Sequence, residues 1–210
     1  MTIITRRNLL IGGLGGTTAL TLGATLLSFG QGAQAQELTV EDVLFDPANP
    51  VLGNPDGDVT LVEFFDYQCP YCKANHKDLT EAVAADGNVR LVMKDWPIFG
   101  APSIRASQLV LGAASAGEYE KAHDAIMTTD GRLTEDDINA ALKKASLDLE
   151  ELDAAYRAER NKWDGLMARN SSQATQLGLQ GTPAFIIGTT IYPGAMDRTA
   201  LDEAIAASRA

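Results

Sequence analysis

Two short apolar runs separated by a helix-compatible segment dominate the early part of the chain. Residues 59–65 and 89–94 are rich in β-branched and other apolar side chains with little polar alternation, which is typical of strands covered on both faces. Residues 70–85 between them suit a helix, and Asp86-Gly87 provides a stop. The order strand, helix, strand predicts a right-handed parallel crossover.

The next region has a different pattern, which predicts a block of helices. Residues 103–178 are rich in Ala, Glu, Lys and Leu and contain no strand-like run. Thr134 and Asp137 are spaced as a capping pair. We expect helix boundaries near Gly117, at Thr129-Asp130-Gly131, at Ser146 and near Gly165.

Short apolar runs return near the C-terminus. Residues 184–187 and 191–192 predict two strands of a hairpin, and residues 197–208 predict a closing helix. The pattern as a whole predicts an α/β sandwich in which residues 103–178 form an inserted helical domain between the segments 59–102 and 179–210.

The first 35 residues read as an export segment that precedes the fold. Arg6-Arg7 is followed by an uncharged stretch from Leu9 to Phe29, and Ala33-Gln34-Ala35 has the small residues of a cleavage site. The stretch around Arg6-Arg7 also resembles a twin-arginine motif, so we expect a periplasmic protein cleaved after Ala35. A retained membrane anchor is the alternative, because about 20 apolar residues span a bilayer. Residues 36–58 follow as a polar arm whose prolines preclude a long helix.

The charge balance excludes one class of partner. The chain has 17 Lys and Arg residues against 28 Asp and Glu residues, and its formal net charge is −11. A nucleic-acid-binding surface needs an excess of cations to neutralise phosphates. We therefore expect no nucleic-acid partner.

Cys69 and Cys72 are the two cysteines of the chain, and they carry its candidate chemistry. They flank Pro70-Tyr71 where the first predicted strand gives way to the helix. A thiolate at a helix N-terminus is stabilised by the helix dipole and by free N–H groups, so Cys69 is the candidate nucleophile. Cys72 lies one turn deeper on the same face, where it can close a disulfide or resolve a mixed disulfide.

Two inert roles compete with redox chemistry for this pair. A structural disulfide normally closes a long loop, whereas this one would close only a few residues and contribute little stability. A zinc site would need two further ligands, for which only His76 and His123 are available, and a lone histidine on a helix surface is usually solvated. The export segment and the strand-to-helix setting favour a redox pair, with no metal and no cofactor other than the Cys69–Cys72 disulfide.

A second motif, Gly181-Thr182-Pro183-Ala184-Phe185, places a proline directly before an apolar strand. Together with residues 62–72, the run 94–98 and the helical block, it resembles the DsbA-like family of exported thiol:disulfide oxidoreductases from about residue 50 to the C-terminus. The resemblance implies a thioredoxin-like fold with an inserted helical domain, in which a cis Thr182–Pro183 bond faces the disulfide.

The resemblance also implies substrate contacts and partners. Thr182 and Pro183, together with Pro70 and Tyr71, are expected to contact an extended substrate peptide. The substrates would be unfolded or partly folded proteins with cysteines, and a membrane redox partner would reoxidise the enzyme. Since the arm is short for an association module, we expect a monomer.

Two departures from the best-known oxidant of the family leave the direction of exchange open. Tyr71 replaces a histidine between the cysteines, so Cys69 is expected to be less acidic and the disulfide less oxidising. Thr182 replaces a valine and resembles the periplasmic isomerases and reductases. The leading hypothesis is an enzyme that introduces disulfides into substrate proteins. One alternative is an isomerase or reductase that works from the dithiol form. The other is a metal-binding protein that uses Cys69, Cys72 and His76 as ligands.

Glu63 interrupts an otherwise apolar run six residues before Cys69, where the family carries an acidic residue under the active site. A buried carboxylate is costly unless it is paired or protonated, so it often marks function. We expect Glu63 to exchange protons with Cys72; the alternative is a strand-end glutamate that reaches solvent. Lys94 on the neighbouring strand is expected either to pair with Glu63 or to be solvated.

Overall fold

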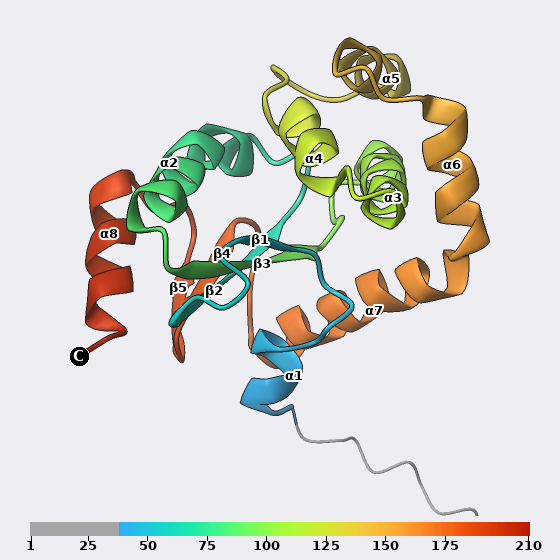
Figure 1. Cartoon of the computed structure of the whole chain (residues 1–210). Coiled ribbons are helices and arrows are strands. Elements are labelled where there is room, and N and C mark those ends of the chain that lie inside the picture. The colour runs from blue at the N-terminus through green and yellow to red at the C-terminus, as the bar shows by residue number, and fades with distance from the viewer. Residues whose placement is uncertain (1–37) are drawn as a thin grey trace, which may run out of the picture. The chain divides into compact units, whose positions relative to one another are not determined.

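The computed structural model describes residues 38–210, which form a five-stranded sheet with helices on both faces (Figure 1). The expectations for residues 1–35, a leader cleaved after Ala35 or a membrane anchor, lie outside the described residues. The strands are β1 (Val51–Gly53), β2 (Val59–Phe65), β3 (Val89–Asp95), β4 (Ala184–Ile187) and β5 (Thr190–Pro193). The helices are α1 (Val40–Leu44), α2 (Pro70–Asp86), α3 (Ala101–Ser115), α4 (Tyr119–Met127), α5 (Glu135–Lys144), α6 (Leu149–Ala158), α7 (Arg160–Gln176) and α8 (Arg198–Ala207).

The sheet register brings the two sequence motifs together. The strand order is β1-β3-β2-β4-β5, and α2 makes the predicted crossover between the parallel strands β2 and β3. β4 runs antiparallel to β2, with Phe64 opposite Ala184. The end of β2, which leads to Cys69, therefore lies beside the start of β4, which follows Pro183.

Each face of the sheet has its own core. Leu61 and Phe65 pack with residues of α2, α3, α4 and α8, whereas Val62 and Phe64 pack with residues of α1 and α7. All seven residues of β2 are buried, which confirms the prediction of a strand covered on both faces. Alternate residues of β2 and β3 therefore point into different environments.

The predicted block of helices is present between β3 and β4, as α3 to α7. The Thr134–Asp137 capping box forms as expected at the start of α5. The expected boundary near Gly165 is wrong, because α7 continues through it and the break falls at Glu159. One glycine in a helix costs about 1 kcal/mol, which is less than the gain from burying its neighbours Trp163 and Leu166.

The polar arm contains two elements that the sequence pattern did not predict. Thr39 caps the five-residue helix α1 through a capping box, and β1 pairs antiparallel with β3. Arg90 of β3 donates to the Leu44 carbonyl at 2.8 Å. A three-residue strand is too short to show an alternating pattern, so the arm belongs to the sheet edge although its sequence reads as a loop.

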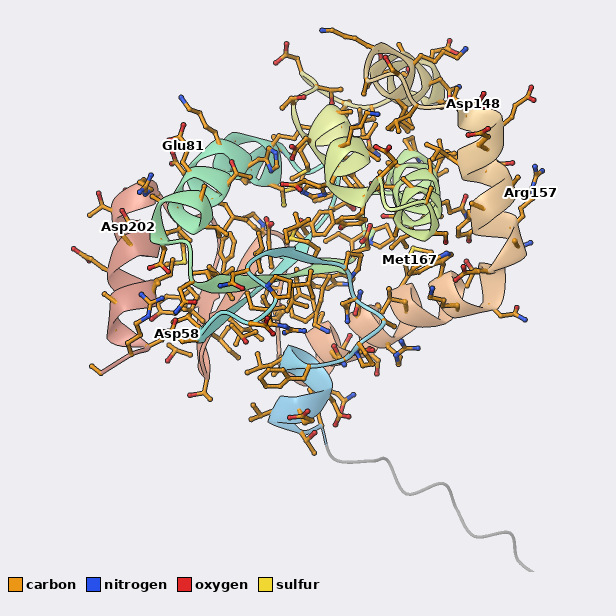
Figure 2. All side chains as sticks on the ribbon, in the orientation of Figure 1. Asp58, Glu81, Asp148, Arg157, Met167 and Asp202 are labelled. Atoms are coloured by element: carbon orange, nitrogen blue, oxygen red, sulfur yellow. The ribbon has the colours of Figure 1, made fainter. Side chains whose placement is uncertain are left out.

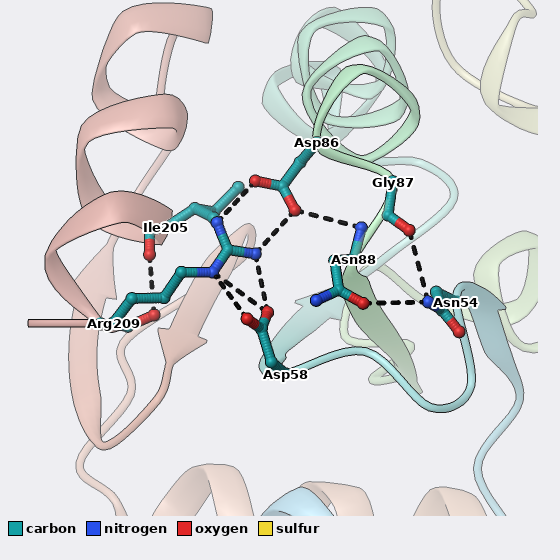
Figure 3. A network of polar contacts seen from close by, with 8 residues as sticks. Asn54, Asp58, Asp86, Gly87, Asn88, Ile205 and Arg209 are labelled. Atoms are coloured by element: carbon teal, nitrogen blue, oxygen red, sulfur yellow. Dashed lines mark hydrogen bonds and ion pairs between the residues drawn. The ribbon is translucent and has the colours of Figure 1, made fainter.

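Arg209, two residues after the end of α8, joins Asp58, just before β2, to Asp86 at the end of α2 (Figure 3). Its Nη2 donates to Asp58 at 2.8 Å and to Asp86 at 2.7 Å, and Asp86 accepts from the Asn88 main chain at 3.1 Å. Other charged side chains, such as Glu81 and Arg157, lie at the outside of the fold (Figure 2).

Candidate active site

Cys69 occupies the N-cap of α2, directly after the loop that follows β2. Its backbone is extended, with φ −69° and ψ 117°, and Pro70 begins the helix without an N–H group. The Cys69 N–H donates to the Asp66 carbonyl at 3.0 Å. Cys69 and Cys72 are both free thiols and are buried at 1% and 0% exposure. The structure thus places the pair where the sequence predicted, at a strand-to-helix junction.

The environment gives the two thiols opposite acidities. The adjacent Cys72 thiol and the main-chain N–H groups of Tyr71 and Cys72 lower the pKa of Cys69 to about 6, although burial opposes this. Burial raises the pKa of Cys72 well above its ordinary value, and the hydrogen bond with Cys69 and the charge of Glu63 raise it further. Near neutral pH, Cys69 is therefore a thiolate and Cys72 remains a thiol.

The loop before β4 faces Cys69. The Thr182–Pro183 bond is cis, and Cys69 Sγ lies 3.1 Å from the Thr182 carbonyl oxygen, to which the protonated thiol donates. Both observations confirm the expected geometry of this motif. Tyr71 is 67% exposed and Pro70 is also exposed, so the residues between the cysteines are open to a substrate.

Glu63 lies inside the protein on the face of β2 that carries Leu61 and Phe65. It is 1% exposed, and neither carboxyl oxygen has a hydrogen-bond partner among residues 38–210. Burial raises the pKa of Glu63 to about 8, and the charge of Cys69 adds to the effect. The alternative of a glutamate that reaches solvent is therefore wrong.

Lys94 neither pairs with Glu63 nor reaches solvent, so both expectations for it are wrong. Met93 is the residue opposite Glu63, and Lys94 lies opposite Phe64, so its side chain points to the other face of the sheet. There its Nζ donates to Gln173 at 2.8 Å and lies 5.7 Å from the centre of the Phe64 ring. Burial lowers the pKa of Lys94 to about 8.

Asp66 is a structural residue of the site that the sequence pattern did not predict. Its carboxylate accepts four hydrogen bonds and joins the loop before Cys69 to the loop after β3 and to the start of α3. The donors are the main-chain N–H groups of Gln68 (2.7 Å), Ile98 (2.6 Å) and Phe99 (3.0 Å) and the Ser103 hydroxyl (2.6 Å). An acidic residue at the end of a buried strand was the available sign, since such a carboxylate needs donors.

Residues on both sides of the cysteines hold the helical block. Leu133 N–H donates to the Gln68 side chain at 3.2 Å, and Gln68 in turn donates to the Phe99 carbonyl at 3.0 Å. Lys73 donates to the Thr129 hydroxyl at 2.8 Å and to the Gly131 carbonyl at 3.0 Å. The block is thereby fixed beside the entrance to the active site.

The two histidines are buried together, contrary to the expectation of a solvated helix histidine. His76 is 7% exposed and its Nε2 lies 3.0 Å from Asp124. The His123 ring lies 5.2 Å from the His76 ring and its Nδ1 is 3.0 Å from the Tyr67 hydroxyl. Burial lowers the pKa of His123 to about 3, so it is neutral. Within residues 38–210, no group of three or more His, Cys, Asp or Glu side chains has a metal-binding arrangement.

Similarity to solved structures agrees with this geometry. A thioredoxin-like oxidoreductase from Silicibacter pomeroyi is 37% identical, with a TM-score of 0.77, covering 82% of this chain and 98% of that one. The Wolbachia pipientis thiol-disulfide exchange protein alpha-DsbA2 is 27% identical, with a TM-score of 0.75 and coverage of 80% and 90%. A periplasmic thioredoxin-like protein from Salmonella enterica serovar Typhimurium is 28% identical, with a TM-score of 0.69 and coverage of 80% and 94%.

Curated relatives match a shorter share of their own length. The Na(+)/H(+) antiporter NhaA of Nitrosospira multiformis is 30% identical over 166 residues, which are 78% of this chain and 26% of that protein. The chain thus spans about a quarter of the curated relatives it matches, and their name describes the longer proteins. No helix in the described part of this chain is long and apolar enough to cross a membrane.

The family comparison covers both segments of the sheet and the helices between them. The model of the DSBA-like thioredoxin domain matches residues 60–206, which include Glu63, both cysteines and the Thr182-Pro183 motif. This chain therefore belongs to the DSBA-like thioredoxin family, and its fold is that of the thiol-disulfide exchange proteins it resembles.

Proposed function

We propose that the protein is an exported disulfide donor that oxidises pairs of cysteines in substrate proteins. The observation that carries the proposal is the unequal setting of the two thiols. Cys69 lies at the N-cap of α2, where its pKa is lowered to about 6, whereas Cys72 is fully buried one turn deeper, where its pKa is raised. A dithiol whose first sulfur is stable as a thiolate is stabilised in the reduced form. Its disulfide is correspondingly oxidising.

The first step forms a mixed disulfide. A substrate thiolate attacks Cys69 Sγ, the Cys69–Cys72 bond breaks, and its electron pair goes to Cys72 Sγ. Cys72 lies in a buried site that disfavours its thiolate, so it takes a proton as it leaves. The Glu63 carboxyl, with its pKa raised to about 8, is the proposed donor of that proton.

The second step releases the oxidised substrate. A second substrate thiolate attacks the substrate sulfur of the mixed disulfide, and Cys69 leaves as a thiolate. The substrate has lost two electrons and the enzyme holds Cys69 and Cys72 as a dithiol. The low pKa of Cys69 makes it a good leaving group, which favours this direction over the reverse. A membrane redox partner then reoxidises the enzyme.

Exposed apolar side chains near the cysteines suit an unfolded substrate. Tyr71, Ile98 and Phe99 are 67%, 42% and 48% exposed, and Asp66 holds the loop that carries the last two. An extended peptide can pair with the main chain at Thr182 and place apolar side chains on these groups. We infer that unfolded or partly folded cysteine-containing proteins are the substrates and that the enzyme acts as a monomer.

Export rests on two independent supports. Arg6-Arg7 and Ala33-Gln34-Ala35 form the pattern of a cleaved leader, and one relative at 28% identity is described as a periplasmic protein. The periplasm is oxidising, which suits a disulfide donor. Fractionation of cells that express the full chain tests this point, with a cleaved periplasmic form as the expected result.

The direction of exchange is tested by the reduction potential of the Cys69–Cys72 pair and by oxidation of a reduced model protein. The reduction potential of thioredoxin is roughly −270 mV. We expect the potential of the Cys69–Cys72 pair to lie well above this value, and we expect stoichiometric transfer of the disulfide to the model protein. A potential at or below that value, with efficient reduction of insulin, would instead establish a reductase or isomerase.

A further inference from the structure

Asn75 is a buried side chain on α2 that binds a distant main-chain segment with both ends of its amide. Its Nδ2 donates to the Met196 carbonyl at 2.7 Å, and its Oδ1 accepts from the Met196 N–H at 2.7 Å. Asn75 is 4% exposed and Met196 is 8% exposed. The segment after β5 is thus hydrogen-bonded to α2, the helix that begins at Cys69.

The same segment is hydrogen-bonded to the loop that faces Cys69. Gly194, two residues before Met196, donates its N–H to the Pro183 carbonyl at 3.0 Å. Thr182, the residue before Pro183, has its carbonyl 3.1 Å from Cys69 Sγ. The contacts form a closed ring that runs from Cys69 along α2 to Asn75, across to residues 194–196, on to residues 182–183 and back to Cys69.

We propose that Asn75 is a positioning residue that sets the separation between the Thr182 main chain and the Cys69 sulfur, and so determines how well peptide disulfides bind. The inference rests on the proposed function, because it assigns the Thr182 main chain to substrate binding. An amide suits this position because it supplies one donor and one acceptor to a single residue. Loss of either leaves a buried main-chain group of Met196 without a partner.

The ring predicts a selective kinetic defect. A peptide disulfide needs both the Cys69 thiolate and the main chain at Thr182, whereas a small aromatic disulfide needs only the thiolate. In Asn75→Ala we therefore expect KM for a cysteine-peptide disulfide to rise about fivefold to tenfold, the scale of one displaced hydrogen bond. The rate with the small disulfide should stay within about twofold of wild type.

Asn170→Ala is the matched control. Asn170 is fully buried on α7 and donates its Nδ2 to the Asp95 carbonyl at 3.2 Å, outside the ring of contacts. Both variants should lose thermal stability, but only Asn75→Ala should change the ratio of peptide to small-disulfide reactivity. An equal change in both variants would show that Asn75 is merely structural and would overturn the inference.

Asn75→Asp provides a second variant if the alanine protein does not fold. It keeps the acceptor for the Met196 N–H and places an oxygen against the Met196 carbonyl, so the same selective rise in KM is expected. An unchanged KM in a folded Asn75 variant would contradict the inference. A crystal structure of either variant in which the Thr182 carbonyl is still about 3.1 Å from Cys69 Sγ would also contradict the inference, independently of activity. A wild-type protein unable to exchange disulfides would refute the proposed function alone.

Discussion

Each face of the central sheet buries an ionisable side chain on β2 or β3, and the surroundings of the two side chains differ. Glu63 on β2 and Lys94 on β3 are 1% and 0% exposed. They differ by one position in register, since Glu63 lies opposite Met93, and so they point to opposite faces. Burial moves the pKa of each to about 8, upward for Glu63 and downward for Lys94.

The difference between them is in their partners. Lys94 donates to Gln173 and lies over the Phe64 ring, whereas the Glu63 carboxyl has no hydrogen-bond partner among the described residues. Partners hold the side chain of a buried group in one position. Without them, burial disfavours the charged form of a carboxyl and moves its pKa toward neutral, where it can both give and take a proton. Under the proposed function, the Glu63 face serves proton exchange with Cys72, whereas the Lys94 face holds its charge with a hydrogen-bond partner.

The largest expected effect comes from the sulfurs on the Glu63 face. Cys69→Ser should abolish thiol:disulfide exchange, because the serine hydroxyl does not ionise near neutral pH. Cys72→Ser should still allow attack by Cys69 but accumulate mixed disulfides, since the resolving sulfur is lost. Non-reducing gels after incubation with a peptide disulfide distinguish the two. Trapping by Cys69→Ser instead of Cys72→Ser would reverse the assignment.

The next effect separates Glu63 from Lys94 directly. Glu63→Gln should slow resolution of a mixed disulfide by Cys72 about tenfold to a hundredfold. This step is the reverse of the proposed first step, so Glu63 accepts the Cys72 proton instead of donating it, and glutamine cannot do so. The initial attack by Cys69 should change much less. Stopped-flow measurement resolves the two steps. Lys94→Met is the control and should change neither rate, and equal resolution rates in Glu63→Gln and wild type would leave Glu63 without a catalytic role.

Much of the site could be predicted from sequence because it depends on local pattern. The apolar run 59–65, the stop at Gly87 and the placement of two cysteines at a helix start require only neighbouring residues. The burial of Glu63 could likewise be predicted from neighbouring residues, since it is a single acid that interrupts a run of apolar residues.

The contacts that depend on register and on distant segments could not be predicted in this way. Lys94 was expected beside Glu63 or in solvent, but a shift of one residue in register decides which face a strand side chain occupies. The partner of Asn75 is 121 residues away, and the donors to Asp66 come from three separate segments. Hydrophobic periodicity carries no information about such pairings.

The stability of the protein should depend on pH with opposite slopes from the two faces. The pKa of Glu63 is about 8 in the folded protein and 4.5 in its ordinary state. The folded protein therefore holds a proton that the unfolded chain has lost between these pH values, and the contribution of Glu63 to stability falls as the pH rises from 4.5 to about 8. The pKa of Lys94 is about 8 in the folded protein and 10.5 in its ordinary state. The unfolded chain therefore holds the extra proton between these pH values, and the contribution of Lys94 to stability rises as the pH rises from about 8 to 10.5. Each slope is at most about 1.4 kcal/mol per pH unit.

Denaturant unfolding across pH tests both slopes by difference from wild type. Glu63→Gln should gain relative stability as the pH rises from 4.5 to about 8, and Lys94→Met should lose relative stability as the pH rises from about 8 to 10.5. A flat difference for Glu63→Gln would mean that its carboxyl is not protonated in the folded protein, and would remove the basis of the comparison.

The smallest effect concerns a charge that has partners but is not buried. Arg209 donates to Asp58 and Asp86, yet its side chain is 32% exposed and that of Asp58 is 52% exposed, so water screens these pairs. Arg209→Ala should therefore lower Tm by no more than about 4 °C, with the loss shrinking further in high salt. Arg198→Ala is the matched control, since Arg198 forms a pair with Asp202 four residues along α8 and ties no second segment. A larger loss of Tm in Arg209→Ala that persists in high salt would contradict this expectation. It would show that partners stabilise a charge as strongly at the surface as inside the protein, and would weaken the distinction between Glu63 and Lys94.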